Sequence, residues 1–558
     1  MALLAHPQKN SALDQGPLLP WGPHEISGLL TQLRTDSRPW DVLVIGAGIT
    51  GAGVARDAAM RGLRVLVIEA KDIAFGTSSR STRLIHGGVR YLEQGELGLV
   101  YEALRERQRL YEIADHLVRP ARFLFPAYKG DRLPLWQLRV GLSMYDALSL
   151  YRSHGHKTMR AKATLEAEPL LAPQYLCGAV AYEDAITDDA RLTLATLQSA
   201  RRYGAQVLSY TSVKQIHPQS PQGHLAVLED GSEIRAHTVI VAAGPWTGEK
   251  LLGGAGRDLL TLARGVHIVM RHEDVPVRQP LVIQVQKQRR ILFVVPWGTR
   301  TYIGTTDESY EGDPGESSVY AADKEDLFRL VRRLLPNAKL TIDRIISTWS
   351  GVRPLVRAKP SRWRGRNSTV ELSRKHRVVI NEHNVIAVVG GKLTTYRSMA
   401  EEAVDLACQQ LVLHHGLVKK PSQTHLHPLI LGPILTPEEL SDPLIADLAP
   451  RHGPEARILA QTGREKPELG ERLVDDLPYR WVEVDHAITY EGCQHLDDIL
   501  RRRLPLALTD SQLGGGVARK IAERLVDAWG GSNQDVEAEL ERYKQLLYQE
   551  TGFTLKQV

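Results

Sequence analysis

The chain has 558 residues, which is too long for one compact core, so about two or three domains are expected. Its formal net charge of +5 is modest for this length, so it gives no argument for nucleic acid and fits an anionic small substrate or an anionic membrane surface at least as well. Three widely separated cysteines without a C-x-x-C pair exclude a disulfide framework and a cysteine zinc site, and they suit a reducing compartment.

Residues 1–39 are rich in Pro, Gly and His and precede the first predicted strand. They lack the apolar core of a secretory signal and the Arg-rich, acid-poor character of a transit peptide, so we expect a partly ordered extension. The sequence has no run of about 18 apolar residues, and no membrane-spanning helix is expected.

Residues 41–69 read as a strand, a glycine-rich turn, a helix and a second strand. The first strand is a short apolar run typical of a strand buried on both faces. Gly46, Gly48 and Gly51 follow at G-x-G-x-x-G spacing, which permits a tight turn, close backbone approach to a pyrophosphate, and close helix–strand packing. Glu69 ends the second strand, where an acid accepts hydrogen bonds from a ribose. The pattern predicts a dinucleotide site, compatible with FAD and with NAD; a purely structural glycine turn is the alternative.

Residues 73–93 are unusual for a linker, because small hydroxylated residues at 77–79 precede two glycines and Arg90-Tyr91. Such a segment can lay backbone and hydroxyls along a cofactor while it aims Arg90 and Tyr91 elsewhere; a plain surface loop is the alternative. Residues 98–117 have helical periodicity. Residues 118–152 mix cations with bulky apolar side chains, which fits either an interfacial membrane contact or a helix and loop over a core.

The middle of the chain returns to strands. The apolar run 239–243 ends at Gly244, and we expect it to rejoin the first sheet with its glycine close to the ligand. Residues 264–306 look like a separate antiparallel sheet that forms the wall of a substrate cavity. His267 lies inside one of its strands, where a satisfied core or surface histidine is the alternative to a catalytic one.

Residues 357–377 are dense in Lys and Arg around a single Trp, which indicates either a solvated loop or a segment facing anionic lipid. A further apolar strand at 384–389 leads through Gly390 and Gly391 into a helix, which is again an anion-binding arrangement. N-terminal and late segments are therefore expected to share one nucleotide-binding fold. The C-terminal part is mostly helical and carries no motif with assignable chemistry.

Eight segments, in this order, resemble FAD-dependent, membrane-associated glycerol-3-phosphate dehydrogenases. They are the fingerprint, TSSRSTRLIHGGVRYLE (77–93), DDARL (188–192), AAGPW (242–246), HIV (267–269), PWGTRTYIGTTD (296–307), SGVRPL (350–355) and GGKLTTYR (390–397). The tail has no EF-hand calcium loop, so the calcium-responsive mitochondrial form is not the match and a bacterial-type enzyme is expected.

The resemblance implies an α/β fold with a glutathione-reductase-type, Rossmann-like FAD-binding domain, a substrate domain on an antiparallel sheet, and an all-α C-terminal domain. After the extension 1–39, the expected FAD-binding domain is discontinuous and comprises 40–117, 180–250 and 384–412. The expected substrate domain comprises 118–179 and 251–383, and the helical C-terminal domain comprises 430–558.

The resemblance also implies oxidation of sn-glycerol 3-phosphate to dihydroxyacetone phosphate, with a hydride moving from C2 to N5 of FAD and electrons passing to membrane quinone. The implied location is the cytoplasm, with peripheral attachment to the anionic inner face of the cell membrane. A homodimer is expected, and neither nucleic acid nor metal is expected.

This chemistry needs a base for the hydroxyl proton and cations for the phosphate. By similarity, Arg90 and Lys392 bind the phosphate beside Tyr91, and Arg353 lies near the reacting carbon and oxygen. His267 is the candidate base, because an imidazole titrates near neutral pH. The implied catalytic residues are thus His267, Arg353 and Lys392. The implied FAD-binding residues are Gly46, Gly48, Gly51, Glu69, Thr77, Ser78, Ser79, His86, Gly87, Gly244, Gly390, Gly391, Leu393 and Thr394.

Three other functions remain open. Glycerol-3-phosphate oxidase shares these motifs and gives its electrons to O2, although this chain has no clear insertion in the substrate domain of the kind that oxidases tend to carry. An FAD-dependent amine oxidase needs a carboxylate-binding site and no phosphate site, so the three cations argue against it. A non-catalytic flavoprotein is the third alternative.

Overall fold

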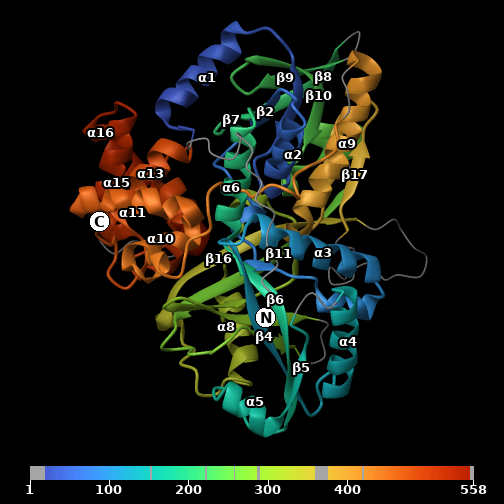
Figure 1. Ribbon diagram of the computed structural model, residues 1–558, viewed down its shortest axis with the longest axis vertical. Coiled ribbons are helices and arrows are strands. Elements are labelled where there is room, and N and C mark those ends of the chain that lie inside the picture. Colours follow the sequence, from blue (N-terminus) through green and yellow to red (C-terminus); the bar gives the residue numbers. More distant parts are fainter. Residues whose placement is uncertain are drawn as a thin grey trace.

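The computed structural model describes residues 19–150, 154–219, 223–256, 258–285, 290–357, 375–416 and 420–552. They form two sheets and a helical C-terminal domain (Figure 1). Most of the cationic stretch at 357–377, and residues 1–18 of the N-terminal extension, lie outside the described residues. No helix of the described residues is long and apolar enough to cross a membrane.

The first sheet carries the fingerprint at its centre. Its strands run in the order β17-β18-β10-β1-β2-β7, with β9 on β10 and β8 on β9. β1 pairs in parallel with β2 and with β10, and β10 pairs in parallel with β18, so the N-terminal and late segments share one sheet as expected. The strands are β1 Trp40–Ile45, β2 Val65–Ile68, β7 Gln206–Leu208, β8 Val213–Gln219, β9 Gly223–Leu228, β10 Glu233–Val241, β17 Arg377–Ile380 and β18 Ile386–Val389.

Helix α2 (Ile49–Met60) follows the fingerprint and packs between α6 (Asp189–Arg202) and α9 (Tyr396–His415) (Figure 1). Small residues make this close packing possible. A Cβ added at Gly53 would lie 2.9 Å from the ring of Tyr396. The parallel strands and these helices bury an apolar core, which fixes the strand ends that carry the glycine turns.

The second sheet runs β15-β11-β14-β13-β12-β4-β6-β3, with β16 on β11 and β5 on β6. All of its pairings are antiparallel except that of β12 with β4. Its strands are β3 Leu84–Ile85, β4 Val118–Tyr128, β5 Lys157–Arg160, β6 Leu176–Thr187, β11 Leu260–Arg271, β12 Leu281–Gln284, β13 Ile291–Trp297, β14 Arg300–Gly304, β15 Glu308–Tyr310 and β16 Ile345–Val356. The helices beside it are α3 Leu97–Ile113, α4 Leu135–Leu148, α5 Ala161–Ala167 and α8 Ala321–Arg332.

Three strands pair, in whole or in part, in a different sheet from the one that the expected domain boundaries assign to them. β6 continues in the second sheet to Thr187, because it pairs with β4 along its whole length as far as Val118. β3 lies within the expected segment 40–117 but pairs with β6. β17 lies within the expected segment 251–383 but joins the first sheet, because it forms an antiparallel hairpin with β18.

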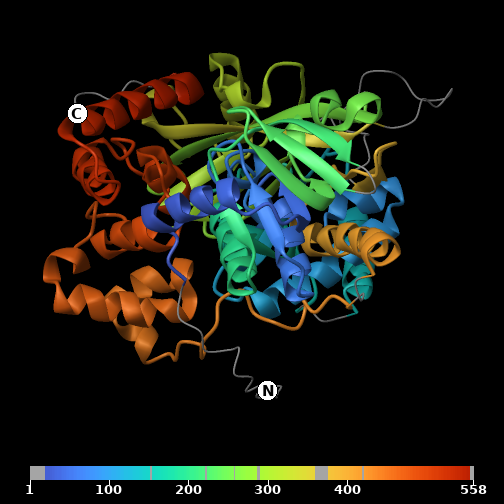
Figure 2. The same ribbon diagram turned by 90° about the horizontal axis from the view of Figure 1, so that it is seen from above.

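The C-terminal helices form a domain with its own apolar core on one side of the molecule (Figure 2). They are α10 Pro443–His452, α11 Ala456–Glu465, α12 Pro467–Gly470, α13 Trp481–Tyr490, the π-helical turn η12 Asp498–Arg503, α14 Leu506–Thr509, α15 Gly515–Ala528 and α16 Asn533–Thr551. Part of the N-terminal extension is ordered against this domain. Trp21, which precedes α1 (Pro23–Thr35), is buried, and its backbone N–H donates to Thr489 O at 2.8 Å.

Candidate active site

A cavity of about 1130 Å³ lies where the ends of the first sheet meet the second sheet. The loops that follow β1, β2, β10 and β18 line it, together with strand β16 and the turn η2 (Thr77–Ser79). These are the carboxyl ends of parallel strands, where open α/β sheets bind their ligands.

The fingerprint glycines have different neighbours. Gly46 has φ +105°, and a Cβ there would lie 2.6 Å from Ala242 O, so the turn requires glycine. A Cβ at Gly51 would lie 1.8 Å from Gly46 O, which explains the close approach of α2 to β1. Gly48 lines the cavity and is the N-cap residue of α2. No side chain at this position makes a capping hydrogen bond to the helix. The N-terminus of α2 therefore faces the cavity, as an anion-binding helix end does.

Glu69 lines the cavity at the end of β2. Its Oε2 accepts from the N–H of Ala47 at 2.7 Å, and its Oε1 accepts from the N–H of Lys71 at 2.9 Å. Desolvation outweighs these two donors and raises the pKa of Glu69 above its ordinary value. The backbone thus fixes the carboxylate beside the glycine turn, where an adenosine ribose would lie.

The hydroxylated turn η2 connects the fingerprint to the second sheet. Ser78 Oγ accepts from the N–H of Ile49, the first residue of α2, at 2.9 Å. Thr77 donates to Val352 O of β16 at 2.6 Å. Ser79 Oγ is buried and has no hydrogen-bond partner among the described residues.

The cofactor residues implied by sequence fall into two groups. Most of them line the cavity, whereas Gly51, Ser79 and Gly87 are not among its described lining residues. Gly87 packs away from the cavity, because its N–H donates to Tyr145 Oη at 2.8 Å and a Cβ there would lie 2.8 Å from Leu104. Those that line it are Gly46, Gly48, Glu69, Thr77, Ser78, His86, Gly244, Gly390, Gly391, Leu393 and Thr394.

Two of the three implied substrate cations meet at one aromatic ring. Lys392 Nζ lies 3.8 Å from the ring centroid of Tyr91, and the Arg90 guanidinium carbon lies 5.7 Å from it. Tyr91 and Lys392 line the cavity. Arg90 lies beside Tyr91 and is not among the described residues that line the cavity. The structure therefore brings Arg90, Tyr91 and Lys392 together, although they come from segments 300 residues apart in sequence.

Arg353 lines the cavity from β16. Its Nη2 donates to Thr305 Oγ1 at 2.7 Å, and its Nη1 contacts Thr306 O at 3.2 Å and pairs with Asp307 at 3.3 Å. Gly265 makes this position possible, because a Cβ there would lie 2.2 Å from Arg353 Nη2.

His267 is on β11 and is 1 % exposed. It lies behind the described residues that line the cavity and is not one of them. Its ring stacks on Trp349 at 4.5 Å between centroids, and its Nε2 lies 3.0 Å from Oγ1 of Thr82, which does line the cavity. Its Nδ1 has no hydrogen-bond partner among the described residues. Burial, together with the charges of Arg353 and Arg83, holds the pKa of His267 well below its ordinary value.

Sequence reasoning missed one wall of the cavity. Four residues of α16 line it: Arg542, Leu546, Gln549 and Glu550. Their spacing is that of one face of a helix, which in a sequence is typical of any helix packed on a domain. No local signal distinguishes a face that covers a core from one that covers a ligand.

Two family models match overlapping parts of the chain. The model described as FAD dependent oxidoreductase matches residues 41–397, and the model described as C-terminal domain of alpha-glycerophosphate oxidase matches residues 386–536.

Curated relatives match most of the chain. An aerobic glycerol-3-phosphate dehydrogenase of Staphylococcus saprophyticus is 38 % identical over 69 % of this chain and 70 % of its own length. A glycerol-3-phosphate dehydrogenase of Mycobacterium leprae is 32 % identical over 94 % of this chain and 90 % of its own. Among solved structures, the glycerol-3-phosphate dehydrogenase of Bacillus halodurans complexed with FAD is 26 % identical, with a TM-score of 0.75, over 95 % of this chain and 98 % of that chain.

The glycine turn, the N-terminus of α2 at the cavity and the fixed Glu69 carboxylate suit a dinucleotide, and the family models and relatives identify that dinucleotide as FAD. The chain belongs to the family of FAD-dependent glycerol-3-phosphate dehydrogenases.

Proposed function

We propose that this protein oxidises sn-glycerol 3-phosphate to dihydroxyacetone phosphate and passes the electrons to a membrane quinone. We infer the substrate from the pair of cations beside Tyr91, of which Lys392 lines the cofactor cavity. A phosphate dianion needs such charge-assisted donors, and an amine substrate does not. The names of the two relatives above support the same substrate.

In this reaction the phosphate lies against Lys392, Arg90 adds positive charge from beside Tyr91, and Tyr91 holds the two cations in position. Arg353 is held by Thr305 and Asp307 in the same cavity, and we assign it to the oxygen on C2. Bound FAD supplies the acceptor for the hydrogen and the electron pair that leave C2. Positioning of this kind contributes several kcal/mol to catalysis, on the order of 7–11 kcal/mol where alignment is ideal.

The hydroxyl proton needs a separate acceptor. Thr82 lines the cavity, and its hydroxyl lies 3.0 Å from Nε2 of His267. We assign the proton to His267, reached through Thr82. The lowered pKa keeps the imidazole neutral at neutral pH, so that it can accept a proton, and it also makes His267 a weaker base than an ordinary histidine.

Membrane attachment is supported by the outer face of α4. Trp136, Val140 and Met144 are 65 %, 56 % and 43 % exposed, and their spacing of four places them on one side of the helix. We call these three side chains the α4 apolar face. An exposed cation, Arg139, lies beside it, and apolar side chains next to cations suit the surface of an anionic bilayer. We therefore propose peripheral attachment to the cytoplasmic face of the cell membrane. The homodimer stays a prediction.

Oxygen as the electron acceptor is the alternative, because the C-terminal family model is named for alpha-glycerophosphate oxidase. The substrate is tested first and the electron acceptor second. The purified FAD-loaded protein, kept anaerobic, should lose its yellow colour on addition of sn-glycerol 3-phosphate and keep it with glycerol. Absence of bleaching rules out the substrate. The reduced protein is then mixed with a soluble quinone or with O2. Faster reoxidation by the quinone supports the dehydrogenase, and faster reoxidation by O2 supports the oxidase.

A further inference from the structure

Helix α16, the last of the C-terminal domain, forms part of the wall of the FAD cavity. Arg542, Leu546, Gln549 and Glu550 line it together with Glu69 of the fingerprint. They project from one face of the helix, because residues three and four apart are neighbours on a helix surface. The C-terminal family model ends at residue 536, so this face lies beyond the part of the chain that it matches.

An ion pair ties α16 to the cofactor-binding loop. Arg80, which directly follows the hydroxylated turn η2, pairs with Glu550, and Arg501 of η12 pairs with the other carboxylate oxygen at 3.0 Å. The Glu550 side chain is 11 % exposed. Although burial acts in the opposite direction, Arg501 and Arg80 lower the pKa of Glu550, so the carboxylate is ionised at neutral pH.

Two further contacts hold the same helix. Ser318, in the loop before α8, donates to Gln549 O at 2.7 Å. Arg542 pairs with Asp497 at 2.5 Å. Helix α16 therefore contacts the FAD-binding loop, the substrate domain and its own domain at the edge of one cavity.

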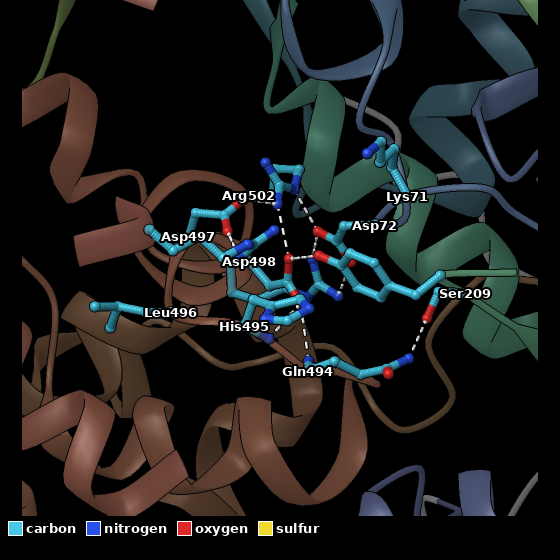
Figure 3. A network of polar contacts seen from close by, with 12 residues as sticks. Lys71, Asp72, Ser209, Gln494, His495, Leu496, Asp497, Asp498 and Arg502 are labelled. Atoms are coloured by element: carbon cyan, nitrogen blue, oxygen red, sulfur yellow. Dashed lines mark hydrogen bonds and ion pairs between the residues drawn. The ribbon is translucent and has the colours of Figure 1, made fainter. Parts of the chain in front are cut away.

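A buried network fixes the C-terminal domain beside the same end of the cavity (Figure 3). Asp72 lies three residues after Glu69 and pairs with Arg503 at 2.7 Å and with Arg502. Arg502 also pairs with Asp497 at 2.6 Å, and Asp497 is the partner of Arg542 in α16. All of these groups except Arg542 are almost fully buried. The chain of ion pairs therefore runs from the loop after β2 to α16.

The face of α16 starts at the adenosine end of the cavity, where Arg542 lies, and runs to Glu550 beside the loop that leads to Thr82. Lys71 and Thr211 line the cavity with Glu69, and the N–H of Thr211 donates to Glu69 O at 2.8 Å. Tyr210, next to Thr211, donates to Asp498 of η12 at 2.5 Å. The C-terminal domain is thus connected to the loops that surround the ribose position.

We propose that α16 is a cofactor-binding element: its face covers FAD opposite the fingerprint, from the adenosine end at Arg542 toward the pyrophosphate at Gln549 and Glu550, and slows release of the cofactor. The Glu550–Arg80 pair holds the helix against the loop. Arg542 and Gln549 supply donors on the exposed side of the adenosine and pyrophosphate. This inference rests on FAD occupying the cavity and is independent of the substrate and the electron acceptor.

Hydrogen exchange tests the position of α16 without a mutation. The full chain is compared after removal of flavin and after reloading with FAD. Amides of the last three turns of α16 should exchange at least tenfold more slowly with FAD bound. Helix α11 lies in the same domain and is absent from the described lining, so it should not change. Equal exchange of α16 in the two states would overturn the proposal.

A matched pair of variants tests the ion pair. Glu550→Gln removes the charge that Arg80 and Arg501 require, and Glu541→Gln removes an exposed charge from the same helix. Titration of the apoprotein with FAD, followed by flavin fluorescence, should give a Kd about tenfold higher for Glu550→Gln and an unchanged Kd for Glu541→Gln.

The same variants separate cofactor binding from a purely structural role. If Glu550 acts on the cofactor, FAD should raise the melting temperature of Glu550→Gln by less than it raises that of the unmodified protein. Two results would each mean that α16 does not retain the cofactor, and the proposal would fail. One is that FAD raises the melting temperatures of Glu550→Gln and of the unmodified protein equally. The other is that Glu550→Gln and Glu541→Gln have the same Kd for FAD.

Discussion

At the scale of single residues, the cations around Tyr91 have unequal positions. Lys392 lines the cavity, whereas Arg90 lies beside Tyr91 behind it. Both add positive charge for a phosphate, but a donor at the cavity wall can contact it directly. A charge-assisted hydrogen bond is worth about 1.5–3 kcal/mol, which corresponds to roughly 10- to 100-fold in binding.

Lys392→Ala should therefore raise KM for sn-glycerol 3-phosphate roughly 100-fold, and Arg90→Ala should raise it roughly tenfold. Flavin content should stay unchanged for Arg90→Ala, because Arg90 is outside the described lining of the cofactor cavity. Steady-state kinetics and the flavin absorbance of the purified variants measure both. Lys129→Ala removes an exposed cation at the end of β4 and is the control. If KM changes no more in either variant than in this control, the phosphate does not bind here.

His267 gives a second test, because we propose it as the base and its ring is also packed in the core. As a base it should matter to the rate, and as the stacking partner of Trp349 it should matter to stability. For His267→Ala we expect flavin reduction at saturating substrate to slow by ~10²–10⁴, the usual contribution of general acid–base catalysis. Anaerobic stopped-flow absorbance measures this rate, and melting of the same variant measures the packing contribution.

The pH dependence of flavin reduction identifies the base further. Because the pKa of His267 is lowered, the imidazole stays neutral as the pH falls through 6.5, and the reduction rate should not drop there. A rate that falls with a midpoint near 6.5 would assign the proton to a group with an ordinary histidine pKa. A His267→Ala variant that is destabilised but reduced at the normal rate would leave His267 as a core residue.

At the scale of elements, local signals predicted the fingerprint well. The strand at Trp40–Ile45, the glycine turn and α2 each follow from residues that are neighbours in sequence. The boundaries at β3 and β17 were not predictable in this way, because a short strand joins whichever sheet offers a partner edge. The position of His267 behind Thr82, and of α16 on the cavity, depends likewise on contacts between residues more than 180 positions apart.

The α4 apolar face predicts a measurable membrane affinity. Burying a large apolar side chain contributes about 1.5–3 kcal/mol when it is complete, and these side chains are partly buried already. Trp136→Ser together with Val140→Ser should therefore weaken binding to anionic lipid vesicles by roughly 10- to 100-fold in a sedimentation assay. Tyr320→Ser removes an exposed aromatic ring at the start of α8 and is the control. Equal binding of the double variant and the control would place the membrane contact elsewhere.

At the scale of the whole molecule, charged pairs join the C-terminal domain to helix α6 beside the first sheet. Arg191 of α6 pairs with Glu491 at 2.7 Å, and Arg202 pairs with Glu455 at 2.6 Å. Breaking a buried pair by removing one partner costs about 3–5 kcal/mol, because the other charge is left buried. His452 lies at this junction. Its Nδ1 is 3.4 Å from Arg191 Nη2, and its Nε2 is 2.9 Å from Glu483.

The junction should weaken in acid because of His452. Burial and the neighbouring Arg191 lower the pKa of His452 to about 3, whereas in the unfolded chain it is about 6.5. Between these values the unfolded state binds a proton that the folded state excludes. The free energy of unfolding therefore falls as the pH falls below 6.5, by at most about 1.4 kcal/mol per pH unit. His452→Gln removes this titration. In urea unfolding, the unmodified protein should be the more stable of the two at pH 8, and its advantage should shrink steadily between pH 6.5 and 4.5. His217→Gln, at an exposed histidine of β8, should show a difference that does not vary with pH. A constant gap for His452→Gln would mean that the junction does not exclude the proton.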